Sequence, residues 1–175
     1  MGTADLCDVH HPRNVDVVGT DGIKIAEPGL RDLGGKVRFH GMISTVRCFE
    51  NNPLVRKALE EPGNGRVLVV DGGASRRCAL LGDNLAAMAV RNGWSGLVIN
   101  GMIRDSEDVA QMDLGVKAWG THPLKSSKRD AGLRDVPVSF CGVQFVPGHW
   151  LYADGDGIVV SETELPTPPR EEPLK

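Results

Sequence analysis

The feature that most constrains the fold is an uninterrupted apolar run, Val-Leu-Val-Val, within residues 66–71, with glycines on both sides. A strand that is covered on one face alternates apolar and polar residues, whereas a strand that is covered on both faces is apolar throughout. A chain with such a strand needs helices or a second sheet on each side of it. The run therefore predicts an α/β fold with a central sheet.

Helical segments are expected on both sides of this strand. Before it, Asn52 suits an N-cap and Pro53 the first turn of a helix that ends at Pro62. After it, Asp83 is predicted to cap a second helix that ends near Asn92. Further elements are expected as strands at 36–49, with a break at Gly41, at 96–100 and at 115–119, and as a short helix at 106–112.

The pattern changes at Val136. From there short apolar runs alternate with Cys-Gly, Pro-Gly and Asp-Gly pairs, which is typical of strands joined by tight turns. We expect an antiparallel meander, with 154–157 as a hairpin turn rather than a calcium loop, because no third acid follows at the required spacing. Residues 166–175 hold four prolines and are predicted to be a disordered tail after a single domain of residues 1–165.

Composition excludes several classes of protein. Of the 175 residues, 41% are hydrophobic, which is enough for one core, yet no apolar run approaches the roughly 20 residues of a membrane span. The net charge of −3 argues against direct binding of nucleic acid. No secretory signal is recognisable, so we expect a cytoplasmic protein. The cysteines and histidines have neither the spacing of a zinc site nor the density of a disulfide scaffold.

Three other features of the sequence have simple explanations. The segment 71–75 follows the buried strand but lacks Gly-x-Gly-x-x-Gly, so we expect no dinucleotide or S-adenosylmethionine site. Lys117 is the best-placed lysine for a Schiff base, and we expect it to point to solvent. The basic residues Lys125, Lys128 and Arg129 are expected to form a solvated loop, with anion binding as the alternative.

Two segments remain as candidates for chemistry, Gly82-Asp83-Asn84-Leu85 and Arg104-Asp105. In open α/β sheets, ligands bind beyond the carboxyl ends of the strands and close to helix N-termini, where backbone amides point outward. Both segments are expected at such places. From spacing alone, however, a plain ion pair or a helix cap is the simpler explanation of an arginine beside an aspartate.

Longer stretches of the chain resemble a known family. They include Val-Leu-Val-Val-Asp-Gly-Gly, Ala-Leu-Leu-Gly-Asp-Asn-Leu-Ala and Asp-Leu-Gly-Val-Lys-Ala-Trp-Gly-Thr-His-Pro. These are closely similar to the regulator of ribonuclease activity A family, which shares its fold with the 4-hydroxy-4-methyl-2-oxoglutarate aldolases. The resemblance covers nearly the whole chain. The aldolase signature, an aspartate, twenty residues and then Arg-Asp, is matched by Asp83, Arg104 and Asp105.

The resemblance implies a role for each of these residues. Asp105 would bind a divalent metal ion, Mg²⁺ or Mn²⁺, while Arg104 would contact the 2-oxo group and the enolate oxygen. Asp83 would position a water molecule that acts as acid and base. The other positions would supply groups for the substrate or lie just behind the metal: Gly82, Asn84 and Leu85 for the substrate, and Asp108 behind the metal.

The implied activity is a class II, metal-dependent aldol cleavage of 2-oxo acids to pyruvate, with decarboxylation of oxaloacetate as a side activity. A metal ion and a guanidinium can stabilise the electrons that both reactions leave behind. A β/β/α swivelling-type domain, similar to the phosphohistidine domain, is the implied fold, and a homotrimer or hexamer with sites at subunit boundaries is the implied assembly.

A second hypothesis comes from the regulator branch of the family. It is a protein that binds a ribonuclease or an RNA helicase and inhibits it. The intact Asp83, Arg104 and Asp105 favour the enzyme, because a docking surface does not need that set. The short chain favours the regulator, because dedicated aldolases of the family tend to carry a longer C-terminal extension.

Overall fold

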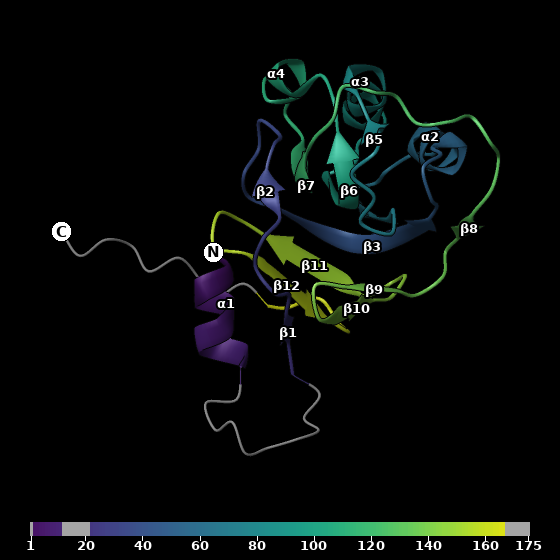
Figure 1. Ribbon diagram of the computed structural model, residues 1–175. Coiled ribbons are helices and arrows are strands. Elements are labelled where there is room, and N and C mark those ends of the chain that lie inside the picture. Colours follow the sequence, from purple (N-terminus) through teal and green to yellow (C-terminus); the bar gives the residue numbers. More distant parts are fainter. Residues whose placement is uncertain (1, 12–21, 167–175) are drawn as a thin grey trace.

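The computed structural model describes residues 2–11 and 22–166, which form a mixed α/β fold around one large sheet (Figure 1). The strand order in this sheet is β1-β12-β11-β3-β4-β6-β7-β2. The predicted tail lies, beyond residue 166, outside the described residues. Among the helices that the structure describes, none is long and apolar enough to cross a membrane.

The predicted buried strand lies inside the parallel part of the sheet. It is β4 (Val67–Asp71), which runs parallel to both of its neighbours, and its four apolar residues are fully buried. The carboxyl ends of the parallel strands therefore share one edge of the sheet. The other parallel strands are β3 (Phe39–Arg47), β5 (Ala79–Leu81), β6 (Gly96–Ile103) and β7 (Gly115–Thr121).

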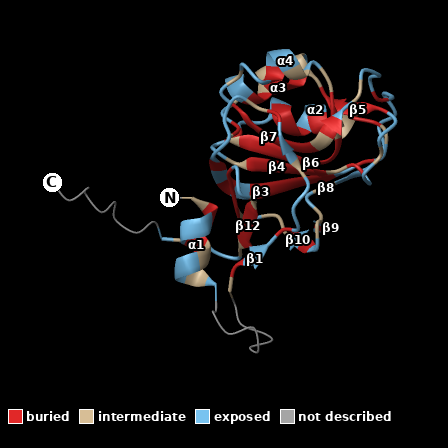
Figure 2. Ribbon diagram, turned by 60° about the vertical axis from the view of Figure 1, so that its left-hand side comes forward, coloured by how far each residue is buried: buried red, intermediate tan, exposed pale blue. Residues whose placement is uncertain are grey.

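Helices cover one face of the parallel strands, and the strands that follow Val136 cover the other (Figure 1). The helices are α2 (Pro53–Glu60), α3 (Asp83–Arg91) and α4 (Ser106–Val109). The predicted meander has the expected antiparallel strands, but they form two hairpins rather than one meander. β9 (Val138–Phe140) and β10 (Val143–Phe145) make a separate two-stranded sheet, whereas β11 (Trp150–Ala153) and β12 (Ile158–Ser161) join the large sheet through β3. Each side has its own apolar core, and Figure 2 shows the buried residues concentrated in the sheet between them.

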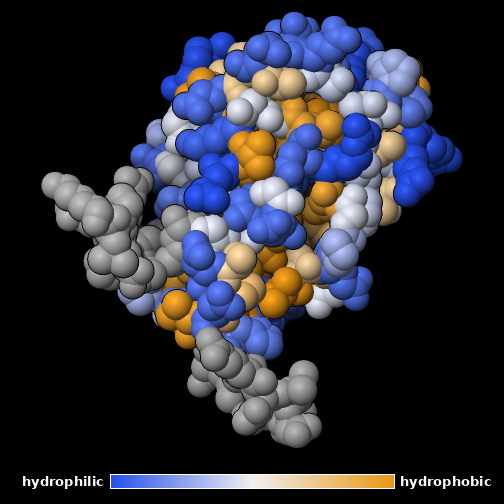
Figure 3. Space-filling model, turned by 90° about the vertical axis from the view of Figure 1, so that its left-hand side faces the viewer, coloured by the Kyte–Doolittle hydropathy of each residue, from blue (hydrophilic) through white to orange (hydrophobic). Residues whose placement is uncertain are grey.

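Four small elements complete the fold: α1 (Thr3–His10), β1 (Lys24–Ile25), β2 (Arg31–Asp32) and β8 (Leu133–Arg134). The helix α1 was not predicted from the sequence. The buried carboxylate of Asp154 holds this helix, accepting hydrogen bonds from the Thr3 amide at 2.7 Å and the Thr3 hydroxyl at 2.7 Å. Figure 3 shows apolar side chains interrupted by polar ones on the face that carries α1 and β2.

Several predicted boundaries were wrong. The strand β3 continues through Gly41, where a break was predicted; a Cβ at this position would lie 2.1 Å from the Gly65 carbonyl oxygen, so glycine permits a close backbone approach. The helix α3 begins at Asp83 with Gly82 as its N-cap, one residue earlier than predicted. The strand β6 runs on to Ile103, and α4 ends at Val109 rather than at residue 112.

The expectation that Lys117 points to solvent was also wrong. Lys117 is only 3% exposed, and its Nζ lies 2.8 Å from Oδ1 of Asp32. The reason is β2, an edge strand that pairs antiparallel with β7 and brings Asp32 opposite Lys117. A buried lysine normally needs such a partner, and this ammonium is therefore committed to Asp32.

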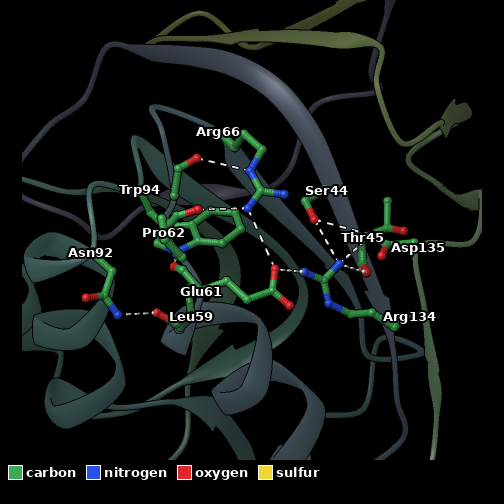
Figure 4. Close-up of polar contacts among 11 residues, drawn as sticks. Ser44, Thr45, Leu59, Glu61, Pro62, Arg66, Asn92, Trp94, Arg134 and Asp135 are labelled. Carbon is green, nitrogen blue, oxygen red and sulfur yellow. Dashed lines mark hydrogen bonds and ion pairs between the residues drawn. The ribbon is translucent and has the colours of Figure 1, made fainter.

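A network of charged residues holds β8, which precedes the two hairpins, against the helical layer (Figure 4). Arg134 donates to the Ser44 hydroxyl at 2.8 Å and to the Glu61 carboxylate at 3.1 Å. The same carboxylate lies 3.7 Å from Arg66, whose guanidinium stacks 4.6 Å above the Trp94 ring. Because Ser44 belongs to β3 and Glu61 follows α2, these contacts hold the segment before the two hairpins against both elements.

Candidate active site

The two segments predicted to carry chemistry meet at the edge where the parallel strands end. Asp105 follows β6 and adopts a left-handed conformation with φ of 52°, and its Oδ2 accepts a hydrogen bond from the Asp83 amide at 3.2 Å. The Nε of Arg104 lies 3.6 Å from the same oxygen. Arg104 is itself held by a bond from its amide to the Leu81 carbonyl at 2.9 Å. Residues 22 positions apart, Asp83 and Asp105, are thus in direct contact.

Gly82 makes this contact possible. A Cβ at Gly82 would lie 2.7 Å from Oδ2 of Asp105 and 3.3 Å from Nε of Arg104. A carbon atom that close to a carboxylate oxygen would force the two loops apart. The sequence analysis assigned Gly82 to substrate binding, and the structure gives it this additional steric role.

A cavity of about 240 Å³ opens beside this contact, between the N-terminus of α2 and the N-terminus of α3. Its wall includes Asp83, Arg104 and the start of α3, so the predicted residues do face a space that could hold a ligand. Among the residues that the structure describes, Asp105 and Asp108 are not part of this wall. Asp105 lies just behind it, with its side chain 35% exposed.

The backbone amides at the start of α3 are partly occupied. The Asn84 amide donates to Oδ1 of Asp83 at 2.7 Å, and the Asp83 amide donates to Asp105. Within the described residues, the Leu85 amide has no recorded acceptor, as is usual in the first turn of a helix. In this arrangement Leu85 is the better placed of the two predicted amides to meet a substrate carboxylate.

The cavity wall also holds cations that the sequence analysis did not assign to the site. Lys125, Lys128 and Arg56 line the cavity together with Arg104, whereas Asp83 is the one acidic residue that the described part of the chain contributes to its wall. Lys128 donates to Oδ1 of Asn52 at 3.1 Å. The basic stretch at 125–129 was the available signal, and its alternative explanation, anion binding, fits this position. The excess of positive charge favours an anionic ligand.

The arrangement at Asp105 fits a magnesium ion better than a zinc ion. Among the described residues, no group of three or more histidine, cysteine or acidic side chains is placed to hold a metal ion. Mg²⁺ often takes only one or two protein carboxylates and completes its octahedron with water and substrate oxygens. Oδ1 of Asp105 has no hydrogen-bond partner recorded in the described part of the chain, so it is available for such an ion.

A larger cavity of about 600 Å³ lies at the same edge, beside the ends of β3 and β4. It is lined by Arg47, Cys48, Asp71 and Arg129 among others, and it contains none of the predicted site residues. Burial, and then the charge of Asp71 and the nearby Cys78, raise the pKa of the Cys48 thiol to about 12. A thiol with such a pKa stays protonated and is a poor nucleophile.

Comparison with known proteins shows which family the chain resembles. A family model described as "RraA-like: Aldolase/RraA" matches residues 3–160. A protein of Alkalilimnicola ehrlichii, provisionally named a 4-hydroxy-4-methyl-2-oxoglutarate aldolase, is 55% identical over 93% of this chain and 96% of its own length. A protein of Burkholderia multivorans with the same name is 52% identical over 94% of this chain and 98% of its own.

Two solved structures have the same fold. One, titled the RNA-processing inhibitor RraA from Thermus thermophilis, is 41% identical with a TM-score of 0.86 and covers 97% of both chains. The other, titled an S-adenosylmethionine:2-dimethylmenaquinone methyltransferase from Geobacillus kaustophilus, is 48% identical with a TM-score of 0.85 and covers 94% of this chain and 97% of that one. The family match, the close relatives and the shared fold show that this chain belongs to the RraA-like family.

Proposed function

We propose that this chain is a divalent-metal-dependent aldolase that cleaves 4-hydroxy-4-methyl-2-oxoglutarate and similar 2-oxo acids to pyruvate, with decarboxylation of oxaloacetate as a side activity. The observation that supports it most is the contact of Asp83, Arg104 and Asp105 at the wall of a cation-rich cavity. The names of the relatives from Alkalilimnicola ehrlichii and Burkholderia multivorans point to the same reaction. The classification as a swivelling-type domain is part of this proposal.

The cavity offers complementary groups to both ends of such a substrate. The carboxylate next to the 2-oxo group would lie at the N-terminus of α3, near the Leu85 amide, with Arg104 facing the 2-oxo oxygen. The distal carboxylate would face Lys125 and Lys128, which also line the cavity. Asn52 is buried, and its amide group donates to the Leu80 carbonyl at 3.0 Å, so its oxygen is fixed where Lys128 binds it.

Cleavage requires removal of the proton from the 4-hydroxyl group and stabilisation of the charge that appears on the 2-oxo oxygen. Asp83 lines the cavity and would take this proton through a water molecule. As the bond between carbons 3 and 4 breaks, its electrons move toward the 2-oxo oxygen, where the Arg104 guanidinium stabilises the negative charge. Carbon 3 of the resulting enolate is then protonated to give pyruvate.

Asp105 would hold the divalent cation, Mg²⁺ or Mn²⁺, through its free Oδ1. When bound, the cation would act as a Lewis acid toward the 2-oxo group. The contact of Oδ2 with the Asp83 amide and with Arg104 would hold the carboxylate in place next to two residues of the cavity wall. Asp108, whose amide donates to the Asp105 carbonyl at 3.1 Å, would stabilise the turn behind it.

The test is a coupled assay of pyruvate release from 4-hydroxy-4-methyl-2-oxoglutarate and from oxaloacetate, with Mg²⁺, with a chelator, and with the Asp105→Ala variant. We expect release with Mg²⁺ and its loss under both other conditions. Release that survives chelation and the substitution would rule out the proposed mechanism.

Inhibition of a ribonuclease is the second candidate function, because the structure titled as an RNA-processing inhibitor is 41% identical over 97% of this chain. A ribonuclease or RNA helicase partner belongs to this second proposal, whereas a trimer or hexamer with sites at subunit boundaries belongs to the aldolase proposal. The second proposal predicts tight binding to such a partner by a protein that is inactive on 2-oxo acids. Binding that persists in the Asp105→Ala variant would separate the two functions on one chain.

The methyltransferase title of the Geobacillus structure is not carried over. In this chain β4 is followed by a turn at 72–74 and then by β5, not by the start of a helix. The backbone amides of a helix N-terminus that would hold a nucleotide-like cofactor after this strand are therefore not placed there.

A further inference from the structure

The wall that carries Lys125 and Lys128 lacks regular secondary structure, so it must be held by other contacts. On one side, Ala79 of β5 donates to the Leu124 carbonyl at 2.8 Å and accepts from the Ser126 amide at 3.2 Å. On the other side, the Ser127 amide donates to the carbonyl oxygen of Glu50 at 2.9 Å. This segment, residues 124–128, is called the lysine wall below. It is attached to β5 on one side and to the loop after β3 on the other.

An ion pair outside the cavity joins these two supports. The Glu50 carboxylate accepts hydrogen bonds from Arg77 Nε at 2.5 Å, from Arg77 Nη2 at 2.8 Å and from the Ser75 hydroxyl at 2.8 Å. Arg77 stands two residues before Ala79. The contacts therefore form a closed ring, from Glu50 to Ser127, along the chain to Leu124, across to Ala79 and back through Arg77 to Glu50.

The backbone of Glu50 is also unusual. Its φ is 56°, a left-handed conformation that non-glycine residues seldom adopt. The same is true of Ala74 after β4 and of Asp105 after β6, with φ of 57° and 52°. Three parallel strands thus end in a strained turn at the edge that carries the cavity. Such strain persists where surrounding contacts enforce it, and it clusters at functional sites.

The ion pair favours the charged form of Glu50. Hydrogen bonds from Arg77 and Ser75 lower the pKa of its carboxyl group below the usual range. The bidentate geometry makes the pair directional, although the Arg77 side chain is 75% exposed and the Glu50 side chain 25% exposed, so the pair acts mainly by fixing geometry. Among the described residues, neither Glu50 nor Arg77 is part of the wall of either cavity, so the pair does not contact a ligand there directly.

We propose that Glu50 and Arg77 form a positioning pair, which holds Lys125 and Lys128 at the cavity wall and thereby sets the affinity for the distal carboxylate of the substrate. The identity of that substrate rests on the proposed function. The claim that the ion pair holds the lysine wall does not depend on the proposed function.

The first experiment tests only whether the ion pair holds the lysine wall. Amide hydrogen exchange at residues 124–128 is compared between the wild type, Glu50→Gln and the control Glu162→Gln, which removes the same charge from an exposed position near the C-terminal end of the described chain. We expect exchange in this segment to rise about tenfold or more in Glu50→Gln only, because local opening becomes easier. Exchange unchanged in this segment would overturn the proposal, whatever the protein catalyses.

The second experiment tests the consequence for binding. In Glu50→Gln we expect KM for oxaloacetate to rise about tenfold while kcat changes by less than about twofold, because only uniform binding is lost. A purely structural defect would lower kcat through loss of active protein and leave KM unchanged. The charge swap Glu50→Arg with Arg77→Glu should restore part of the affinity, and its failure to do so would contradict the pair.

Binding of succinate, followed by calorimetry, separates this proposal from the proposed function. If the wild type binds succinate more tightly than Glu50→Gln but releases no pyruvate from any 2-oxo acid, the aldolase fails and the positioning pair stands. If both proteins bind succinate equally and both cleave 2-oxo acids with equal KM, the aldolase stands and the positioning pair is wrong.

Discussion

Two cavities lie along the same edge of the sheet, and the larger is not the one that resembles an active site. The cavity of about 600 Å³ contains Asp71, whose Oδ1 is already engaged by the Gly73 amide at 3.0 Å and by Asn100 at 2.8 Å. The cavity of about 240 Å³ contains four basic side chains and a single acidic one, between two helix N-termini. The comparison teaches that unbalanced charge, rather than volume, marks the site where an anion would bind.

The largest effect is expected when the carboxylate that would hold the metal is removed. For Asp105→Asn we expect kcat/KM for 2-oxo acid cleavage to fall by about a thousandfold, because metal and electrostatic stabilisation are lost together. Steady-state pyruvate release measures the effect, with circular dichroism as a control for folding. A loss of less than about tenfold would mean that the metal lies elsewhere.

The next effect concerns the contact of the two loops. Gly82→Ala places a carbon atom 2.7 Å from Asp105 Oδ2, and we expect activity to fall about a hundredfold, since small displacements of catalytic groups are costly. The same assay measures it. As a matched control, Gly155→Ala adds a methyl group at a turn where its nearest neighbour would be at 3.8 Å, and we expect it to retain activity.

A smaller effect is expected when Lys128, in the wall of the smaller cavity, is replaced, and Arg129, in the wall of the larger one, serves as its control. We expect Lys128→Met to raise KM for a dicarboxylate 2-oxo acid about tenfold, because one charge-assisted contact is lost. Arg129→Met, one residue away but in the wall of the larger cavity, should change KM by less than about twofold. Equal effects of the two substitutions would remove the distinction between the cavities.

The smallest effect on activity is expected far from both cavities, at Asp154. Burial would raise the pKa of this carboxyl group, but hydrogen bonds from Thr3, Asp156 and Gly157 outweigh burial and lower it. A lowered pKa in the folded state means that the carboxylate contributes stability above the usual aspartate pKa of about 3.9 and loses this contribution as the pH falls.

For Asp154→Asn we therefore expect a loss of about 1 to 3 kcal/mol in the free energy of unfolding at neutral pH. This loss should shrink below a pH of about 4, while pyruvate release stays unchanged at neutral pH. Urea unfolding at several pH values measures it. A loss of stability that does not depend on pH would show that the charge of Asp154 is not what holds α1.

Local patterns in the sequence were sufficient to predict much of the framework. The apolar run at 67–70 predicted the central strand, the cap and proline at Asn52 and Pro53 predicted α2, and the turn pairs after Val136 predicted the strands of the two hairpins, though not their division between two sheets. In each case neighbouring residues alone decide the outcome. The contact of Asp83 with Asp105 was expected only because a family resemblance linked two distant segments.

What could not be predicted depends on contacts between distant parts of the chain. Lys117 is buried because Asp32, 85 residues earlier, lies 2.8 Å from it. The residues around Lys117 form no pattern that indicates this partner. Lys125 and Lys128 reach the cavity because Ala79 and Glu50 hold their segment. A loop without periodicity carries no local signal of where it folds, so its role emerged only from the structure.

The aldolase proposal requires a cation at Asp105 to lie beside a 2-oxo acid in the smaller cavity, and paramagnetic broadening by Mn²⁺ can detect both positions at once. In nuclear magnetic resonance spectra recorded with pyruvate, we predict that the amide signals of Asp83, Leu85 and Asp105 broaden at the lowest Mn²⁺ concentrations. Signals of Arg47 and Gly73, beside the larger cavity, should require more Mn²⁺. Broadening that begins at Arg47 and Gly73, or that spreads evenly over the protein, would contradict the account.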